Sequence, residues 1–393
     1  MMRLFLNCLA ASVGGGVTYL RNVVPHLSAR TDVETFVAAP RSLRNDVGKW
    51  PRVSWVEFDP APNAGLRFYQ EQRHLPKLVR ERGADVLVSA GNFALRKSPV
   101  PQILLSGNSL YTSADFSRDL WSRREYKMLL VTRLKGMLAR RSIEWADRTA
   151  APSEAFAEDL RQWAGGRVEV IYHGFDRESF FANGTPLPLA VQSKLDSPGD
   201  AVRLLFVSHY NYYRNFETLL RALPLVRERL GRRVTLFLTC SLCRDANPGS
   251  YRAESAAALV RKLGLEDQVC ELGPIPYRLL HQLYRICDVY VTAAYAETFA
   301  HPLVEAMASG IPIVASDLPV HREICSEAAV YFSRFSPEDL ADRVVGLLRL
   351  SSLRERLVEA GKTRAREFSW RMHVGQLVGL AAQLAGTKQS LAA

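Results

Sequence analysis

Two carboxylates, Glu297 and Glu305, are separated by seven residues in a stretch that predicts the start of a helix. Pro302 is typical of a first helical turn, and Gly310 is typical of the position that follows a last turn. The first backbone N–H groups of a helix have no partner within it, and such groups bind phosphate. We therefore expect Glu297 in a loop, Glu305 on the helix, and a phosphate-binding helix start formed by Ala300, His301, Pro302 and Leu303.

The residues from Glu305 to Asp317 read EAMASGIPIVASD. Together with Glu297 they resemble the motif of family 4 of the retaining, nucleotide-sugar-dependent glycosyltransferases, in which two glutamates flank seven residues. The resemblance implies the α/β GT-B fold, with two Rossmann-like doubly wound parallel-sheet domains facing across a cleft. It also implies that Glu305 accepts hydrogen bonds from the donor's ribose hydroxyls. Glu297 would hold hydroxyls of the transferred sugar.

The segment 207–215, VSHYNYYRN, is similar to the family segment in which an arginine and a lysine clamp the donor's diphosphate. Arg214 stands at the lysine position and supplies a fixed positive charge. His209 stands at the arginine position, which weakens one half of the clamp. The resemblance thus implies that Glu297, Arg214 and His209 act in catalysis. Arg214 would stabilise the charge that develops on the departing diphosphate, which is commonly the largest catalytic contribution.

The first half of the chain contributes further expected contacts. Gly14, Gly15 and Gly16 look like the family's glycine loop after the first strand, where the donor approaches the backbone closely. His173 lies in a segment similar to the family's junction before the second domain, and Asn108 stands where the family usually has a histidine. We expect both to contact the acceptor or the sugar. Ala300 departs from the family's usual glycine, and its methyl group would alter the approach of the backbone to the donor.

The resemblance implies a hexosyltransferase that retains anomeric configuration and uses a UDP- or GDP-linked sugar. The acceptor would be a glycan or a lipid-linked molecule in polysaccharide or glycoconjugate biosynthesis. No Asp-x-Asp pair occurs in the chain, so we expect activity without a divalent metal and with no cofactor besides the donor. Two alternatives remain: a sugar-nucleotide epimerase of the same architecture, and a catalytically silent sugar-nucleotide-binding protein. The chain lacks a G-x-G-x-x-G after its first strand, which disfavours an NAD-dependent oxidoreductase.

Short apolar runs alternate with longer amphipathic stretches along the whole chain, a pattern typical of βαβ units with parallel sheets. Residues 183–200 are rich in Pro, Gly and Ser and lack periodicity, which is typical of an interdomain linker. We expect an acceptor-side domain over 1–185, a linker over 186–200 and a nucleotide-sugar domain over 201–368. A C-terminal helix over 369–393 would cross back to the first domain. The predicted strands are Arg3–Leu9, Glu34–Ala38, Asp85–Ala90, Gln102–Leu105, Val168–Tyr172, Arg203–Val207, Val234–Leu238, Val289–Thr292 and Ile311–Ala315.

The composition fits these domains. The chain has 393 residues, of which 48% are hydrophobic and 23% charged, as in ordinary globular proteins. Its 51 basic and 40 acidic residues give a net charge of +11, which attracts phosphorylated molecules and anionic surfaces. A nucleic-acid-binding protein would explain the charge but not the motif. No apolar run of about eighteen residues occurs, and the six cysteines are sparse, so we expect a cytoplasmic protein.

The positive charge is concentrated between Arg118 and Arg148, a segment with nine basic and four acidic residues. Leu130, Leu134 and Met137 lie among them. One interpretation is a basic amphipathic helix that meets an anionic membrane or a lipid-linked acceptor, with the protein at the inner face of the membrane. The other interpretation is an ordinary surface helix with a charged outer face.

Overall fold

The computed structural model describes residues 1–11, 15–58, 61, 63–182, 184–243 and 245–392. The chain divides into two compact units, each built on one sheet of parallel strands. The first unit comprises Met1–Ser113, Leu120–Gly174 and Ser369–Ala393, and the second comprises Ala114–Asp119 and Phe175–Phe368. Two parallel-sheet α/β units confirm the fold class expected from the sequence.

The first sheet has seven strands in the order β3-β2-β1-β4-β5-β6-β7. Its central strands are rich in Val, Leu and Phe and are buried along their length, as expected of parallel strands covered on both faces. The strands are β1 (Met2–Asn7), β2 (Val33–Ala38), β3 (Val53–Val56), β4 (Val86–Ala90), β5 (Gln102–Leu105), β6 (Arg148–Ala151) and β7 (Val168–Val170).

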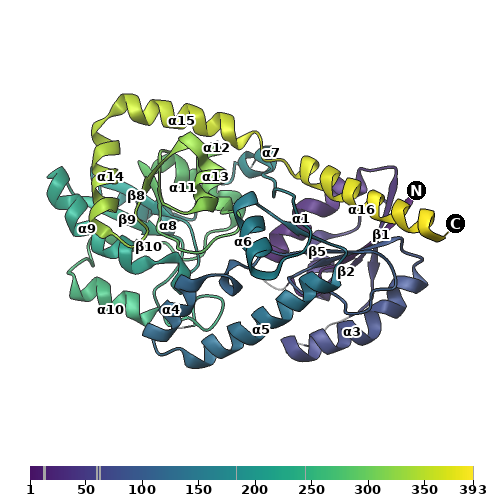
Figure 1. Cartoon of the computed structure of the whole chain (residues 1–393). Helices are drawn as coiled ribbons and strands as arrows, with labels where there is room; N and C mark the ends of the chain where they lie inside the picture. The colour runs from purple at the N-terminus through teal and green to yellow at the C-terminus, as the bar shows by residue number, and fades with distance from the viewer. Residues whose placement is uncertain (12–14, 59–60, 62, 183, 244, 393) are drawn as a thin grey trace. The chain divides into compact units, whose positions relative to one another are not determined.

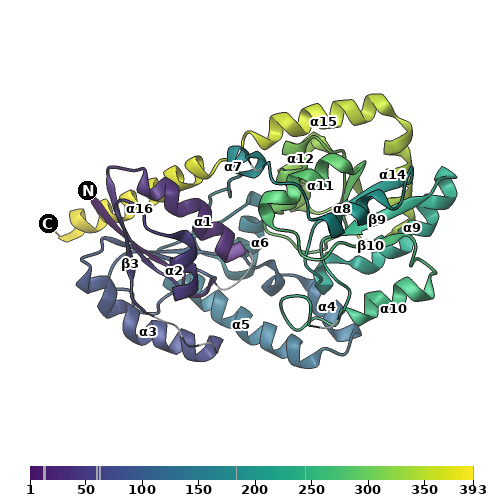
Figure 2. The same ribbon diagram turned by 180° about the vertical axis from the view of Figure 1, so that it is seen from behind.

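Helices cover both faces of this sheet (Figure 1, Figure 2). The last helix, α16 (Trp370–Ala392), lies along α1 (Gly15–Ser28), and its residues Val374 and Leu377 are buried in the same core as Leu20 of α1. The end of the chain therefore completes the core that the first strand begins. The other helices are α2 (Arg41–Val47), α3 (Ala64–Glu81), α4 (Ala114–Ser122), α5 (Tyr126–Trp145) and α6 (Glu154–Ala164), with the short 3-10 turn η1 (Ser109–Tyr111).

The second sheet has six strands in the order β10-β9-β8-β11-β12-β13. They are β8 (Val202–Phe206), β9 (Val234–Leu238), β10 (Val269–Glu271), β11 (Val289–Thr292), β12 (Ile313–Ser316) and β13 (Ala329–Phe332). The helices and turns are α7 (Arg177–Phe181), α8 (Leu189–Asp196), η2 (Tyr212–Arg214), α9 (Phe216–Leu230), α10 (Glu254–Lys262), η3 (Tyr277–Leu279), α11 (Leu280–Ile286), α12 (His301–Ser309), α13 (Pro319–Cys325), η4 (Ser326–Ala328), α14 (Pro337–Arg349) and α15 (Ser351–Ala365).

The strand order of the second sheet reverses between β8 and β11. From β8 the chain continues to β9 on one side, and from β11 it continues to β12 on the other. Ligands of open α/β sheets bind beyond the carboxyl ends of the strands at such a reversal. The loops that follow β8 and β11 are therefore the expected place for a ligand, and they carry Arg214 and Glu297.

Several boundaries differ from those expected. The first unit ends at Gly174 rather than at residue 185, and the expected linker contains α8, which belongs to the second unit. The basic segment forms two helices, α4 and α5, because the chain turns between them at Arg124 with a φ of 60°. Four strands, β3, β6, β10 and β13, were not among the predicted ones. Each has only three or four residues, and β3, β6 and β10 also include polar residues, so no uninterrupted apolar run marks these three.

Candidate functional site

Arg214 lies at the end of a short turn that a single asparagine holds in place. Asn215 adopts a left-handed conformation with a φ of 55° between η2 and α9. Its side-chain nitrogen donates to the backbone oxygen of Arg334 at 2.8 Å, and its side-chain oxygen accepts from the Thr218 hydroxyl at 3.0 Å. Asparagine tolerates this conformation better than most residues do. These contacts fix the backbone directly after Arg214.

The Arg214 guanidinium pairs with the Glu297 carboxylate, which comes from the loop after β11. The two side chains are 18% and 9% exposed. The guanidinium also lies 5.3 Å from the ring centroid of Tyr213. Its Nε atom is buried and has no hydrogen-bond partner within the described part of the chain. Two of the three predicted catalytic residues, Arg214 and Glu297, thus meet at the strand-order reversal.

The helix that carries Glu305 begins as expected at its proline and ends at its glycine. Helix α12 spans His301–Ser309, with Pro302 in the first turn and Gly310 as the C-terminal cap. Ala300 caps the N-terminus in a left-handed conformation, with a φ of 63°. Pro302 has no N–H, and the Leu303 N–H donates to the Ala300 carbonyl at 2.9 Å. Pro302 and Leu303 therefore offer no unpaired N–H to a phosphate at this helix start, in contrast to the expectation for all four residues.

Glu305 is buried, with 5% of its surface exposed. Its carboxylate accepts a hydrogen bond of 3.0 Å from the Tyr284 hydroxyl of α11. Burial raises the pKa of Glu305 to about 7, although the Tyr284 hydrogen bond opposes the rise. The Tyr284 hydroxyl also lies 3.3 Å from the Pro302 carbonyl, and its single proton serves one acceptor at a time. Near neutral pH the Glu305 carboxyl group therefore exchanges between its protonated and ionised forms, since its pKa is about 7.

His209 lies in the exposed part of the loop after β8. Partial desolvation and the positive charge of Arg214 both lower the pKa of this imidazole. His209 is therefore neutral at pH 7 and offers a hydrogen bond rather than a cation.

His321 of α13 was not identified from the sequence. Its Nδ1 lies 2.9 Å from the Ser316 carbonyl and therefore carries the hydrogen, while Nε2 is buried without a partner among the described residues. Burial, with a smaller contribution from the charge of Arg214, lowers the pKa of His321 to about 4. The Ser316 hydroxyl in turn donates to the Ala294 carbonyl at 2.5 Å. These contacts tie the end of β12 to the loop that carries Glu297.

Asn215, Tyr284 and His321 all position site residues, and no sequence signal points to them. Asn215 and Tyr284 act through contacts with residues distant along the chain, whereas His321 contacts Ser316, five residues before it. Tyr284, for example, precedes its partner Glu305 by 21 positions on a different helix. Its spacing corresponds to no motif.

The remaining predicted residues belong to the first unit, and Gly14 lies outside the described residues. Gly15 is exposed with open space around its Cα, whereas a Cβ on Gly16 would lie 2.9 Å from the Cβ of Ala11. Gly16 therefore permits close packing within the turn. The Asn108 side chain accepts from the Leu110 N–H at 3.1 Å and caps η1, which is a structural role.

His173 packs in a cluster of rings. Its centroid lies 5.8 Å from that of Tyr19, 5.5 Å from that of Trp370 and 5.6 Å from that of His373. His373 is 2% exposed and lies 3.0 Å from the Tyr19 hydroxyl. The cluster joins α1, α16 and the segment before Gly174 within the first unit.

No group of three or more His, Cys, Asp or Glu side chains among the described residues is arranged to hold a metal ion. Among the helices described, none combines the length and apolar character needed to cross a bilayer.

Two family models match the chain. The model "Glycosyl transferases group 1" matches residues 190–364, and "Glycosyltransferase Family 4" matches residues 13–179. The chain has two doubly wound sheets, and Arg214 and the start of α12 lie at the reversal point of the second sheet. Together with the two family models, this defines the chain as a glycosyltransferase of the GT-B type. The two models together span most of it. The chain belongs to glycosyltransferase family 4.

Similar proteins with curated names include D-inositol 3-phosphate glycosyltransferase of Thermomonospora curvata. It is 30% identical over 241 residues, which cover 59% of this chain and 56% of that protein. Phosphatidyl-myo-inositol mannosyltransferase of Mycobacterium tuberculosis is 29% identical over 270 residues, covering 66% of each. The matched region spans about half the length of the Thermomonospora curvata protein.

Solved structures share the fold over nearly the whole chain. Sucrose-phosphate synthase of Thermosynechococcus elongatus is 19% identical with a TM-score of 0.78, and the match covers 98% of this chain and 100% of that one. HepE of Anabaena, in complex with UDP-glucose, is 18% identical with a TM-score of 0.72 and the same coverage. These similarities confirm the GT-B fold.

Proposed function

We propose that this protein is a retaining glycosyltransferase that moves a hexose from a UDP- or GDP-linked donor to a glycan or lipid-linked acceptor. One observation carries the proposal: Arg214 and Glu297 meet at the carboxyl ends of β8 and β11, where Glu305 and the start of α12 also lie. The curated relatives are named as glycosyltransferases, and the HepE structure contains a nucleotide sugar. Neither alternative, the epimerase or the silent binding protein, gains support from these names.

In this proposal Arg214 exchanges part of its contact with Glu297 for the donor's diphosphate. The displaced Glu297 carboxylate then accepts hydrogen bonds from the sugar hydroxyls. Glu305 accepts from the ribose hydroxyls, and its ionised form is the better acceptor. The bond between the anomeric carbon and the diphosphate oxygen breaks as the acceptor oxygen bonds on the same face. A phosphate oxygen takes the acceptor's proton, so the step needs neither metal nor cofactor in this proposal.

A panel of nucleotide sugars tests the proposal through slow donor hydrolysis. The intact protein is expected to hydrolyse one donor, and Glu305→Ala is expected to lose that hydrolysis. Glu228→Ala, at an exposed carboxylate on α9, is the matched control and should retain it. Hydrolysis that is unaffected by Glu305→Ala, or absent for every donor with and without acceptors, contradicts the proposal. Hydrolysis that is lost on chelation and restored by manganese contradicts the metal-independent mechanism.

The acceptor side offers a surface suited to lipid. On α5 the side chains of Tyr126, Leu130, Leu134 and Met137 follow one face at helical spacing and are 51–60% exposed, and Trp121 of α4 is 64% exposed. Exposed basic residues flank this row: Lys127, Arg133, Lys135, Arg140 and Arg141. An apolar row beside cations fits an anionic membrane surface. We therefore include a peripheral position at the inner face of the membrane, in the cytoplasm, in the proposed function.

Sedimentation with vesicles tests this surface. The protein should sediment with phosphatidylglycerol vesicles at low salt and much less with phosphatidylcholine vesicles. Leu134→Glu should abolish sedimentation, whereas Leu66→Glu, at a residue of α3 that is 61% exposed, should not. Equal binding to both lipids, or equal effects of the two variants, contradicts the membrane role.

A further inference from the structure

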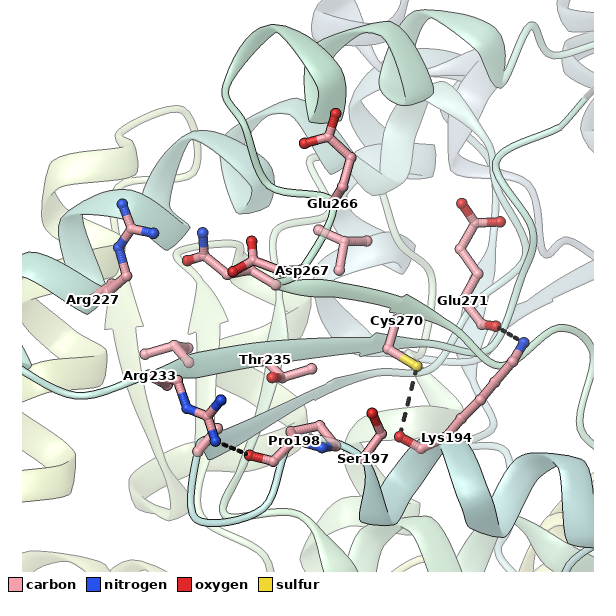
Figure 3. A pocket seen from close by; sticks show the side chains of 14 residues that line it. Lys194, Ser197, Pro198, Arg227, Arg233, Thr235, Glu266, Asp267, Cys270 and Glu271 are labelled. Carbon is pink, nitrogen blue, oxygen red and sulfur yellow. Dashed lines mark hydrogen bonds between the residues drawn. The ribbon is translucent and has the colours of Figure 1, made fainter.

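A cavity lies away from Arg214, Glu297 and Glu305. It has a volume of about 650 Å³ and opens where Ala201 precedes β8, Val234 begins β9 and Val269 begins β10. These are the amino ends of the strands, whereas Arg214 and Glu297 follow the carboxyl ends of β8 and β11. Figure 3 shows the side chains that line the cavity. Its volume is typical of a small-molecule site, which holds roughly 300–1,000 Å³.

The cavity contains an unsatisfied polar side chain. Gln268 is one of the lining residues and is only 3% exposed. Neither its amide nitrogen nor its amide oxygen has a hydrogen-bond partner among the described residues. An unpaired buried polar group is unfavourable, so a ligand that pairs with it gains affinity. Because an amide both donates and accepts, the matching ligand group must do the same, as a hydroxyl does.

The walls of the cavity are held by hydrogen bonds that do not depend on a ligand. Lys194 of α8 donates through Nζ to the Glu271 backbone oxygen at 2.7 Å. Arg233 donates through Nη2 to the Pro198 carbonyl at 2.9 Å. Both bonds appear as dashed lines in Figure 3. They fix the end of α8 against the edge strand β10 and against the start of β9, so the cavity is formed before binding and little ordering cost remains.

The charges around the cavity cancel. Three cations and three carboxylates line it: Lys194, Arg227, Arg233, Glu266, Asp267 and Glu271. The whole chain carries +11, so this locally balanced set differs from its surroundings. A multiply charged anion meets no net attraction here. A neutral ligand rich in hydroxyls can instead use the amide, the carboxylates and the guanidinium groups together.

We propose that the cavity lined by Gln268 at the amino ends of β8–β10 binds a neutral saccharide residue and so serves as a second carbohydrate site. Its connection with catalysis rests on the proposed function: it would hold a distant sugar of the acceptor or product glycan. Thr235, which is 4% exposed and also lines the cavity, contributes a hydroxyl from β9.

Saturation-transfer NMR and calorimetry with methyl glycosides of glucose, mannose and N-acetylglucosamine, and with myo-inositol, test the proposal. At least one of them should bind, and Gln268→Leu should weaken that binding at least tenfold. This substitution replaces an unpaired amide with an apolar group of similar size, so the fold should persist, as a urea unfolding curve would verify. Thr235→Val provides a second, nearly isosteric variant and should also weaken binding.

Glu305→Gln is the control for location and should leave saccharide binding unchanged. If Glu305→Gln abolishes it while Gln268→Leu does not, the saccharide binds elsewhere and the second site is refuted. Binding of none of the probes, or binding of inorganic phosphate in place of saccharides, also refutes it. Saccharide binding that depends on Gln268 in a protein that hydrolyses no donor refutes the proposed function but not this site.

Discussion

Replacing Glu305 with glutamine removes a buried carboxyl group whose pKa lies near 7 rather than at the ordinary 4.5. The folded protein holds this proton more tightly than the unfolded chain does. As pH rises from about 4.5 to 7, the unfolded chain therefore ionises first, and the free energy of unfolding falls. A difference of about 2.5 pKa units at about 1.4 kcal/mol each gives a loss of about 3–3.5 kcal/mol, which is complete above pH 7. Glutamine keeps the shape but cannot ionise.

Urea unfolding of the wild type and Glu305→Gln at pH 4.5, 6 and 8 measures this effect. The two proteins should have similar free energies of unfolding at pH 4.5. The variant should be more stable by up to about 3–3.5 kcal/mol at pH 8. Tyr284→Phe removes the hydrogen bond that favours the carboxylate and should extend the fall in stability to higher pH. A constant difference between wild type and Glu305→Gln at all three pH values refutes the assignment of Glu305 as a buried, readily protonated group.

Three further substitutions test the backbone at Gly174, Gly375 and Ala300. A Cβ on Gly174 would lie 2.0 Å from the Trp370 backbone nitrogen, so Gly174→Ala should lower the free energy of unfolding by about 3 kcal/mol. Gly375 lies within α16, and a Cβ there would have no atom within 4 Å. Gly375→Ala should therefore raise the free energy of unfolding by about 1 kcal/mol in the same urea experiment. Equal effects of the two substitutions would disprove the close approach of Gly174 to Trp370. Ala300→Gly relieves a left-handed conformation with a φ of 63° and should stabilise the protein by about 1 kcal/mol. Thermal unfolding measures this change, and a lower midpoint would show that Ala300 is not strained.

Much of the fold follows from local patterns. The run VTLFL at Val234–Leu238 is apolar enough to predict its strand, and Pro302 and Gly310 predict both ends of α12. Ser336 followed by Pro337 is a pattern typical of a helix start, and in the structure the Ser336 hydroxyl accepts from the Asp339 N–H at 3.1 Å at the start of α14. By contrast, β6 reads RTAA and has no bulky apolar residue to mark it as a strand.

The contacts of the candidate site depend on tertiary structure, which spacing does not encode. Arg214 and Glu297 are 83 residues apart, and only the adjacency of β8 and β11 brings them together. The sequence identified both residues through the motif but gave no reason to expect their pairing. The cavity around Gln268 was also not expected, since its walls come from α8, α9, β9 and β10, and none of these carries a motif.

Calorimetric titration with UDP and with GDP tests the central claim that Arg214 holds the donor's diphosphate. At least one nucleotide should bind the wild type, and Arg214→Ala should weaken binding at least tenfold, or about 1.4 kcal/mol. Arg221→Ala, at an exposed arginine on α9, should bind as the wild type does. Equal affinity of the wild type and a folded Arg214→Ala variant would contradict the account.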